Sequence, residues 1–378
     1  MLKLSKGIIT ILVLLLFGLN QLNAQHGHNN ADVNESENHS ADSHGIREFN
    51  AGEYIVEHVS DAYDWHLTSW GRDHHISIPL PVILYSKHPE LHGGKRFFVF
   101  MSSKFHHAHD PYKGFLISDS EEFDGKIVEF DSHGNELGRP IDLSITKTIA
   151  EAIISLIILI IILVSAARKA KRSTGKAPTG LQNFLEPIII FIRDEVAKPA
   201  IGETKYKKFM PYLLSVFFFI LLNNFIGLIP FPPFGANVTG NIAVTMVLAL
   251  FTLGITTING NKHYWKEIYN PDVPWWLKFP IPLMPIIELS GVITKPFVLM
   301  VRLFANMLAG HMVVSVFISL IFIFASLMGP VAGFAISPVS IAFSVFILLL
   351  DVLVSFIQAY VFTLLSAIYF GMATAEHD

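Results

Sequence analysis

Five ionisable side chains lie inside two long apolar stretches near the C-terminus, where a charge is costly. The stretches cover about residues 282–328 and 338–372. The five groups are Glu288, Lys295, Arg302, His311 and Asp351. An Arg at the centre of a membrane helix costs roughly 3 kcal/mol or more and keeps its proton, so another group must balance it. Because such groups mark ion pathways, the sequence predicts proton or ion transfer within a membrane.

The spacing of these groups predicts which of them lie at the same depth. If the two stretches form an antiparallel hairpin, facing residues have a constant index sum. Arg302 and Gln358 have a sum of 660. His311 and Asp351 have a sum of 662, and both sums put the apex near residue 330. The second pair then lies about 13 Å beyond the first along the helix axis. A nearby carboxylate moves the pKa of a histidine within the working range, so His311 and Asp351 form a candidate proton-transfer pair.

The positions of these groups around the helix axis separate them further. Nine residues at about 100° each put His311 half a turn from Arg302. Asp351 and Gln358 are seven residues apart and share one face of the last helix. We therefore expect Arg302 to face one partner while His311 lines a separate water path.

The composition places these helices in an integral membrane protein. Of the 378 residues, 52% are hydrophobic and 15% are charged, against roughly 25% charged in soluble domains. We predict an all-α membrane domain over residues 148–378 with about five transmembrane helices, the last two long, tilted and forming an antiparallel hairpin. The expected elements are helix 1 at 148–167, an interfacial helix at 181–198, helix 2 at 206–229, helix 3 at 241–258, helix 4 at 282–328 and helix 5 at 338–372.

Residues 1–24 are predicted to be a secretory signal peptide. Lys3 and Lys6 precede an apolar core of ten residues, which is too short to cross a bilayer of about 30 Å, and cleavage is expected after Ala24. An uncleaved anchor is the alternative, and either way the next segment is exported. The basic residues at 168–172 hold the end of helix 1 in the cytoplasm. We predict a multi-pass protein of the bacterial inner membrane with a periplasmic N-terminal domain and a cytoplasmic C-terminus.

Residues 25–147 differ in character from the membrane part. We expect a small exported domain that is His-rich, disordered at 25–45 and β-rich from residue 54 onward. Strand-like runs occur at 75–84, 96–101 and 126–130. Histidines at 26/28, 74/75 and 106/107/109 could bind zinc or copper, but their spacing matches no tight set of metal ligands, so we favour a solvated surface and predict no metal site.

Several classes are excluded or disfavoured by what the sequence lacks. It contains no cysteine, and its net charge of −4 is too small to imply nucleic-acid binding. No Walker A motif occurs, because Gly175-Lys176 is followed by Ala177 and lacks the upstream glycine. The chain is therefore predicted to bind no cofactor and to hydrolyse no ATP by itself.

Two segments resemble the signature helices of the ATP synthase subunit a family, the membrane stator subunit of bacterial F-type ATPases. They are 288–311 (ELSGVITKPFVLMVRLFANMLAGH) and 351–372 (DVLVSFIQAYVFTLLSAIYFGM). The resemblance spans about 180–375 and is carried by K-P-x-x-x-x-x-R-L-F-x-N-M-x-A-G and I-Q-A-Y-V-F. It implies that Arg302 faces a rotor carboxylate and that Glu288 lies at the cytoplasmic exit. It also implies access-path positions for Asn306, His311, Asp351 and Gln358.

The resemblance further implies two offset half-channels that couple proton flow to rotation and ATP synthesis. The implied partners are the c-ring, b-type peripheral stalk subunits, the remaining ATP synthase subunits and the lipid bilayer. Many bacterial members carry Glu in place of His311 and His in place of Asp351, so this chain has the two types exchanged. Ala305 stands where Gly is common, and the exported N-terminal domain lies outside the compact family pattern. The choice between proton and sodium stays open, since the rotor site largely decides it.

Other interpretations stay open at this stage. A secondary transporter would often show two related halves, a channel would usually show a filter loop or charge ring, and a structural anchor would not need ionisable groups in the membrane. Lys295, beside Pro296, is interpreted as structural, and Glu288 fits an interface position as well as an exit path. Asn223 and Asn224 either join helices through hydrogen bonds, which we favour, or line a path.

Overall fold

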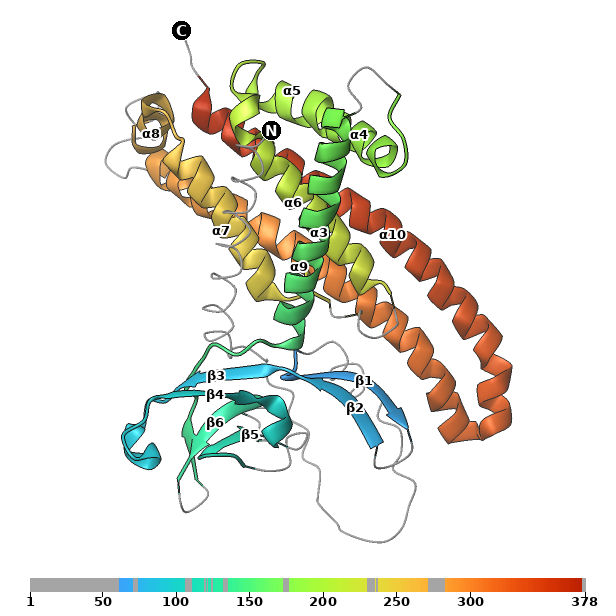
Figure 1. The fold of residues 1–378 in the computed structure, drawn as a ribbon. Coiled ribbons are helices and arrows are strands. Elements are labelled where there is room, and N and C mark those ends of the chain that lie inside the picture. The colour runs from blue at the N-terminus through green and yellow to red at the C-terminus, as the bar shows by residue number, and fades with distance from the viewer. Residues whose placement is uncertain are drawn as a thin grey trace. The chain divides into compact units, whose positions relative to one another are not determined.

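The computed structural model describes residues 61–70, 74–105, 111–118, 120, 122–123, 125–131, 135–172, 177–229, 235, 237–270 and 283–375. The expected signal peptide, the 25–45 segment and the histidines at 26, 28, 106, 107 and 109 lie outside the described residues. The described chain falls into two compact units. One comprises 147–309 and 351–375, and the other comprises 61–146 and 310–350. Figure 1 traces their elements.

A bundle of apolar helices forms the first unit. Helix α3 (Lys147–Arg172) packs against α6 (Tyr206–Gly227), and α7 (Ile242–Ile258) follows. In α6, 83% of the most apolar stretch is buried within the protein. A helix that is hydrophobic all round needs such an environment, so α6 is the core helix of this unit. The side chain of Asn241 caps α7 by accepting a hydrogen bond from the backbone N–H of Ala243 at 2.9 Å.

Short helices join the long ones. The expected interfacial helix extends further than its predicted end, as α4 (Leu181–Phe191), a π-helical segment (Ile192–Ala197) and α5 (Lys198–Ile201). The segment between the expected helices 3 and 4 contains a further short helix, α8 (Lys262–Tyr269), which is bent by 105° from α7. Among the described residues, four helices are long and apolar enough to cross a membrane, or five if α7 and α8 count as one span. The fold is thus largely helical and suited to a membrane, as predicted.

The two C-terminal helices are longer than any other described helix. They are α9 (Leu283–Met328) and α10 (Pro330–Thr374). The predicted gap between helix 4 and helix 5, residues 329–337, is too long. Only Gly329, with φ of +90°, separates the two helices. Glycine adopts this conformation without strain, and Pro330 starts α10 at a position where its missing N–H costs nothing.

The segments on either side of this turn pack closely together. The rings of Phe317 and Phe343 stack with centroids 5.4 Å apart, and the Ser340 hydroxyl donates to the Phe317 carbonyl. A Cβ on Gly333 would lie 2.7 Å from the Cβ of Ala325. Elsewhere these helices expose much apolar surface, since only 17% of the most apolar stretch of α9 and 11% of that of α10 is buried.

The second unit contains a small β-rich region, as the sequence predicts. Its strands are β1 (Asp64–Trp70), β2 (His74–Pro79), β3 (Pro81–Tyr85), β4 (Phe97–Met101), β5 (Phe115–Ser118), β6 (Lys126–Phe130), β7 (Glu136–Gly138) and β8 (Ile141–Asp142). They form sheets in the orders β1-β2, β4-β3-β8 and β5-β6-β7, all antiparallel. The predicted run 126–130 coincides with β6, whereas the run 75–84 is divided at Leu80 into β2 and β3.

An aromatic cluster forms the core of this β-rich region. Its buried members are Tyr63, Val82, Leu84, Phe100, Phe105, Phe115 and Ile127. The Tyr63 hydroxyl donates a 2.5 Å hydrogen bond to Oδ2 of Asp142 in β8. Burial, and then the charge of Asp142, raise the pKa of Tyr63 well above its ordinary value. The bond therefore ties the start of the described region to the strand that precedes α3.

Candidate functional site

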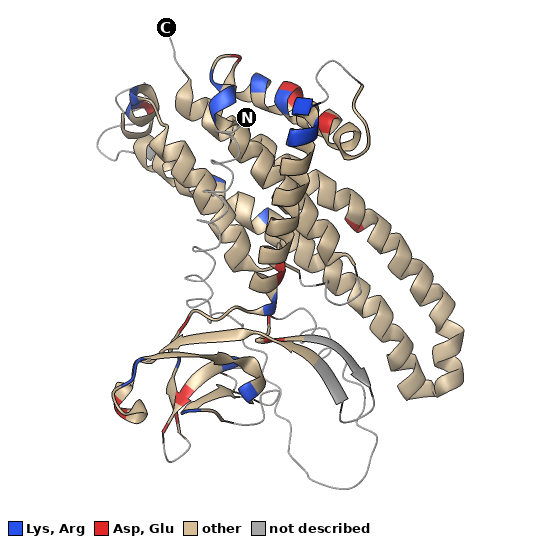
Figure 2. Cartoon of the chain, viewed as in Figure 1, with Lys and Arg blue, Asp and Glu red and all other residues tan. Residues whose placement is uncertain are grey.

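Charge is distributed unevenly over the helices. Figure 2 shows Lys and Arg gathered on the π-helical segment after α4, on α5, on α8 and on the end of α3, while α9 and α10 carry few coloured positions. An ionisable group on α9 or α10 is therefore set in an apolar environment. By the physical argument above, such a group needs either water or a partner.

On α9, Arg302 and Asn306 lie one turn apart on an exposed face. Both side chains are exposed, whereas Leu303 and Met307 are buried at 1% and 3% exposure. The neighbouring Val298 and Val301 are also exposed, at 42% and 37%. The structure thus places the two predicted residues together on an outward apolar surface, open to lipid or to another subunit.

On α10, three polar side chains share a buried face. Asp351, Ser355 and Gln358 are 9%, 0% and 8% exposed, at the i, i+4, i+7 spacing of one helix face. Among the described residues, Asp351 Oδ2 and Ser355 Oγ are buried and make no hydrogen bond. Buried polar atoms are normally hydrogen-bonded, so these two atoms of the polar stripe are left for partners outside the described residues. Sequence reasoning missed Ser355, although its spacing between the two predicted residues was a usable signal.

The other two predicted residues lie on α9 on either side of Arg302 and Asn306. His311 is half-buried, and its pairing with Asp351 stays a prediction. Glu288 is half-buried in the second turn of α9. Burial, and then the negative charge of Glu288, raise the pKa of Tyr264 in α8. Glu288 therefore lies close enough to α8 for its charge to act on Tyr264.

Lys295 borders a small cavity of about 20 Å³, close to the size of one water molecule. Tyr264, Tyr369 and Thr256 also line this cavity. The Lys295 ammonium lies 5.9 Å from the centroid of the Tyr369 ring, a cation–π distance. This contact between α9 and α10 agrees with the structural role expected of Lys295.

Buried polar side chains also join the first spans. The Ser155 hydroxyl of α3 donates to Asn223 Oδ1 of α6 at 2.8 Å. The Thr239 hydroxyl donates to Asn224 Oδ1 at 2.5 Å. The favoured interpretation of the Asn pair as a helix-joining element is therefore confirmed for Asn223. Sequence reasoning missed Glu151, which is 1% exposed one turn before Ser155. A carboxylate just inside the apolar run of α3 was the signal.

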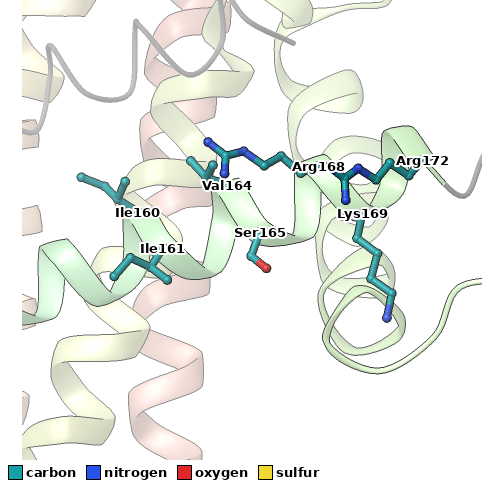
Figure 3. A pocket seen from close by; sticks show the side chains of 7 residues that line it. All are labelled: Ile160, Ile161, Val164, Ser165, Arg168, Lys169 and Arg172. Atoms are coloured by element: carbon teal, nitrogen blue, oxygen red, sulfur yellow. The ribbon is translucent and has the colours of Figure 1, made fainter.

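Two further observations concern where a ligand or a metal ion could bind. A hollow of about 800 Å³ runs along α3, lined by three aliphatic residues, then Ser165, then Arg168, Lys169 and Arg172 (Figure 3). Its lining comes from one helix and contains none of the predicted site residues. Within the part of the chain that the structure describes, no group of three or more His, Asp or Glu side chains is arranged to hold a metal ion.

Together these features define a class: a multi-pass membrane protein with a fixed cation and a buried acid on its long apolar helices. The model of a family described as ATP synthase A chain matches residues 149–371. The chain therefore belongs to the ATP synthase A chain family. A second family, described as a domain of unknown function (DUF8433), matches residues 54–143.

Curated relatives agree with this assignment. ATP synthase subunit a of Chloroherpeton thalassium is 41% identical over 71% of this chain and 79% of the relative. ATP synthase subunit a 2 of Chlorobaculum tepidum is 44% identical over 63% of this chain and 65% of the relative. ATP synthase subunit a of Myxococcus xanthus is 40% identical over 63% and 76%, respectively.

Proposed function

We propose that Arg302 separates two offset half-channels and faces an ionisable carboxylate on a rotating ring of small subunits. Family membership makes the chain a non-catalytic, proton-translocating membrane subunit of an F-type ATP synthase. The proposal assigns that activity to particular residues. Its single strongest support is that α9 carries an exposed cation, Arg302, while α10 carries a buried stripe of polar side chains.

Arg302 supplies a permanent positive charge at the protein surface. Its exposure leaves room for a partner beside α9, and a guanidinium does not lose its proton in proteins. A rotor carboxylate that arrives there is favoured in its ionised form by a few kcal/mol at partly screened contact. The same charge repels a proton on the direct route between the half-channels. Arg302 therefore forces each proton to travel on the rotor.

The outer half-channel leads through His311 and Asp351, with Gln358 and Asn306 along the route. The buried carboxylate of Asp351 and the hydroxyl of Ser355 one turn away support a chain of water molecules on this face of α10. A proton delivered along it neutralises the rotor carboxylate. The neutral group can then enter lipid, where a charge is prohibitive.

The inner half-channel ends at Glu288. This carboxylate acts electrostatically on Tyr264 of α8, and Lys295 and Tyr264 line a cavity of about 20 Å³ in the same region. After nearly a full turn of the ring, the rotor carboxylate releases its proton toward this end. A membrane potential contributes about 2.3 kcal/mol per charge for each 100 mV crossed.

The charge distribution supports the orientation and partners of the subunit. Basic residues on α3, α5 and α8 favour a cytoplasmic location for that end of the bundle, which puts residues 25–147 in the periplasm and the C-terminus in the cytoplasm. Residues 1–24 then serve as the export signal. The partners are the c-ring against α9 and α10, b-type peripheral stalk subunits and the lipid bilayer. The last two helices form an antiparallel hairpin around Gly329.

Replacing Arg302 tests the assignment. An Arg302→Ala variant should lose ATP synthesis driven by a proton gradient, while passive proton conductance of the membrane rises. Arg193→Ala removes the same type of side chain from an exposed ion pair with Asp194 outside the long helices and should retain synthesis. In membrane vesicles, luciferase luminescence reports ATP synthesis and a pH-sensitive dye reports proton conductance. ATP synthesis at the wild-type rate by Arg302→Ala would exclude the scheme.

A further inference from the structure

The three-stranded sheet β4-β3-β8 has an apolar outer face in addition to its buried one. Val82 and Leu84 of β3 point into the aromatic core and are fully buried. Their neighbours on β3 point the other way, and so do alternate residues of the two flanking strands. A sheet of a water-soluble domain normally has a polar second face.

The strand register assembles this outer face into three rows. Phe97, Tyr85 and Ile141 face one another in the first row, and Val99 pairs with Ile83 and Met101 with Pro81 in the next two. The pairing continues past β8, because the backbone N–H groups of Leu143 and Ile145 donate to the carbonyls of Ile83 and Pro81 at 2.9 and 3.0 Å. We call this set the apolar face. Its members are Pro81, Ile83, Tyr85, Phe97, Val99, Met101, Ile141, Leu143 and Ile145.

The apolar face is open. Phe97 is 61% exposed, Val99 57%, Met101 43% and Ile141 42%, and the rest are half-buried or at the exposed limit. Contiguous apolar patches of this kind mark interaction sites with proteins or membranes. The identity of the occupant must come from other features of the same sheet.

The chain tethers this sheet directly to a membrane span. Ile145, the last residue of the apolar face, stands two residues before α3 begins at Lys147. Two residues span at most about 7 Å. The 26 residues of α3 extend about 39 Å, which exceeds the hydrocarbon core of roughly 30 Å by less than two helical turns. The third row is therefore held within reach of the lipid headgroups.

Cations border the opposite end of the face. Lys95 and Arg96 are exposed and directly precede β4. The Arg96 guanidinium donates to the Tyr85 hydroxyl at 3.2 Å, so a cation and an aromatic ring lie together on the first row. Tyr and basic side chains beside an apolar surface have the composition of a membrane-interface anchor.

We propose that the apolar face lies on the outer surface of the bilayer, with its side chains in the headgroup layer and Lys95 and Arg96 on anionic headgroups. The exported domain then rests on lipid at the point where α3 enters the membrane. This placement rests on the proposed orientation of the subunit, with residues 25–147 outside the cytoplasm, and not on the residues of the proton path. A contact with lipid accounts for the exposed apolar face of this domain, which the packing of its aromatic core leaves unexplained.

Site-specific fluorescence in liposomes tests the proposal. Because the chain has no cysteine, Val99→Cys gives the full-length chain one labelling site for an environment-sensitive dye. The liposomes contain phosphatidylglycerol together with lipids brominated in the acyl chains. Glu122→Cys labels an exposed turn outside this sheet and is the matched control.

We expect the dye at position 99 to be strongly quenched by brominated lipid and several-fold less quenched by iodide than the dye at position 122. Adding Phe97→Glu, an exposed position that tolerates charge, should reverse this pattern at position 99. Iodide quenching at 99 equal to that at 122 would overturn the proposal. Protection from both quenchers would also overturn it, because the occupant would then be a protein.

Discussion

The hydroxyl of Ser355 is predicted to be part of the outer proton path, and Ser355→Ala should slow proton flux. Ser355 is fully buried on the same face of α10 as Asp351 and Gln358. Within the described chain its Oγ makes no hydrogen bond. A water chain along this face would use that hydroxyl as both donor and acceptor.

The size of the effect follows from one hydrogen bond. Losing a neutral hydrogen bond to a path water costs about 1 kcal/mol, which corresponds to a roughly fivefold slower transfer. Removal of the titratable group by Asp351→Asn should cost more, on the order of a hundredfold, as for loss of a general acid–base group. Ser355→Ala removes a buried polar atom that has no hydrogen-bond partner among the described residues, so it should leave folding stability unchanged or slightly increased.

Proton pumping driven by ATP in membrane vesicles, read from a pH-sensitive dye, measures the flux. Ser366→Ala is the matched control on the same helix, since the Ser366 hydroxyl is also fully buried but donates to its own helix at the Phe362 carbonyl, 2.8 Å away. Thermal unfolding in detergent checks that both variants are folded. Equal flux in Ser355→Ala and Ser366→Ala would refute the reasoning that the polar stripe conducts.

Two further predictions concern packing. Tyr63→Phe leaves Asp142 Oδ2 without its 2.5 Å donor and should destabilise the exported domain by about 1–3 kcal/mol, measured by limited proteolysis. Folding raises the pKa of Tyr63. The contribution of Tyr63 to the free energy of unfolding is therefore fully present below the pKa of unfolded tyrosine, near pH 10, and is lost as pH rises through the pKa of the folded state. The wild type, but not Tyr63→Phe, should lose protease resistance for this reason at alkaline pH. Ser155→Ala breaks the 2.8 Å bond from α3 to Asn223 and should lower stability in detergent by about 0.5–2 kcal/mol, the range for interhelical bonds in membranes; an unchanged denaturation midpoint would contradict this.

The sequence predicted the long helices well because their signal is physical and local. An apolar run that ends in basic residues specifies where a helix crosses a membrane, and α7 begins within one residue of its expected start because Asn241 caps it. The extent of the turn after Met328 was missed, because glycine followed by proline is a usual signal for a turn or loop. Proline at a helix start and glycine at φ of +90° instead allow a one-residue link.

The candidate site was predictable in its charged members and not in its neutral ones. Arg302 and Asp351 are conspicuous because charges in apolar runs are rare. Ser355 is conspicuous only once α10 is known to bury that face, and serines are common in membrane helices for packing reasons. The apolar face of the exported domain could not be predicted, because it is assembled by pairing β3 with β4 and with residues 141–145. Strand register of this kind joins distant parts of the sequence, and a hydrophobic pattern alone does not specify it.

Cysteine crosslinking tests most directly whether Arg302 works against a moving partner. Asn306 is exposed one turn from Arg302, whereas Leu303 is 1% exposed on the packed side of α9. In the assembled complex, Asn306→Cys should crosslink to a cysteine beside the carboxylate of the ring subunit, and Leu303→Cys should not. Crosslinks from neither position, or from Leu303→Cys alone, would contradict the claim that this face of α9 meets the rotor.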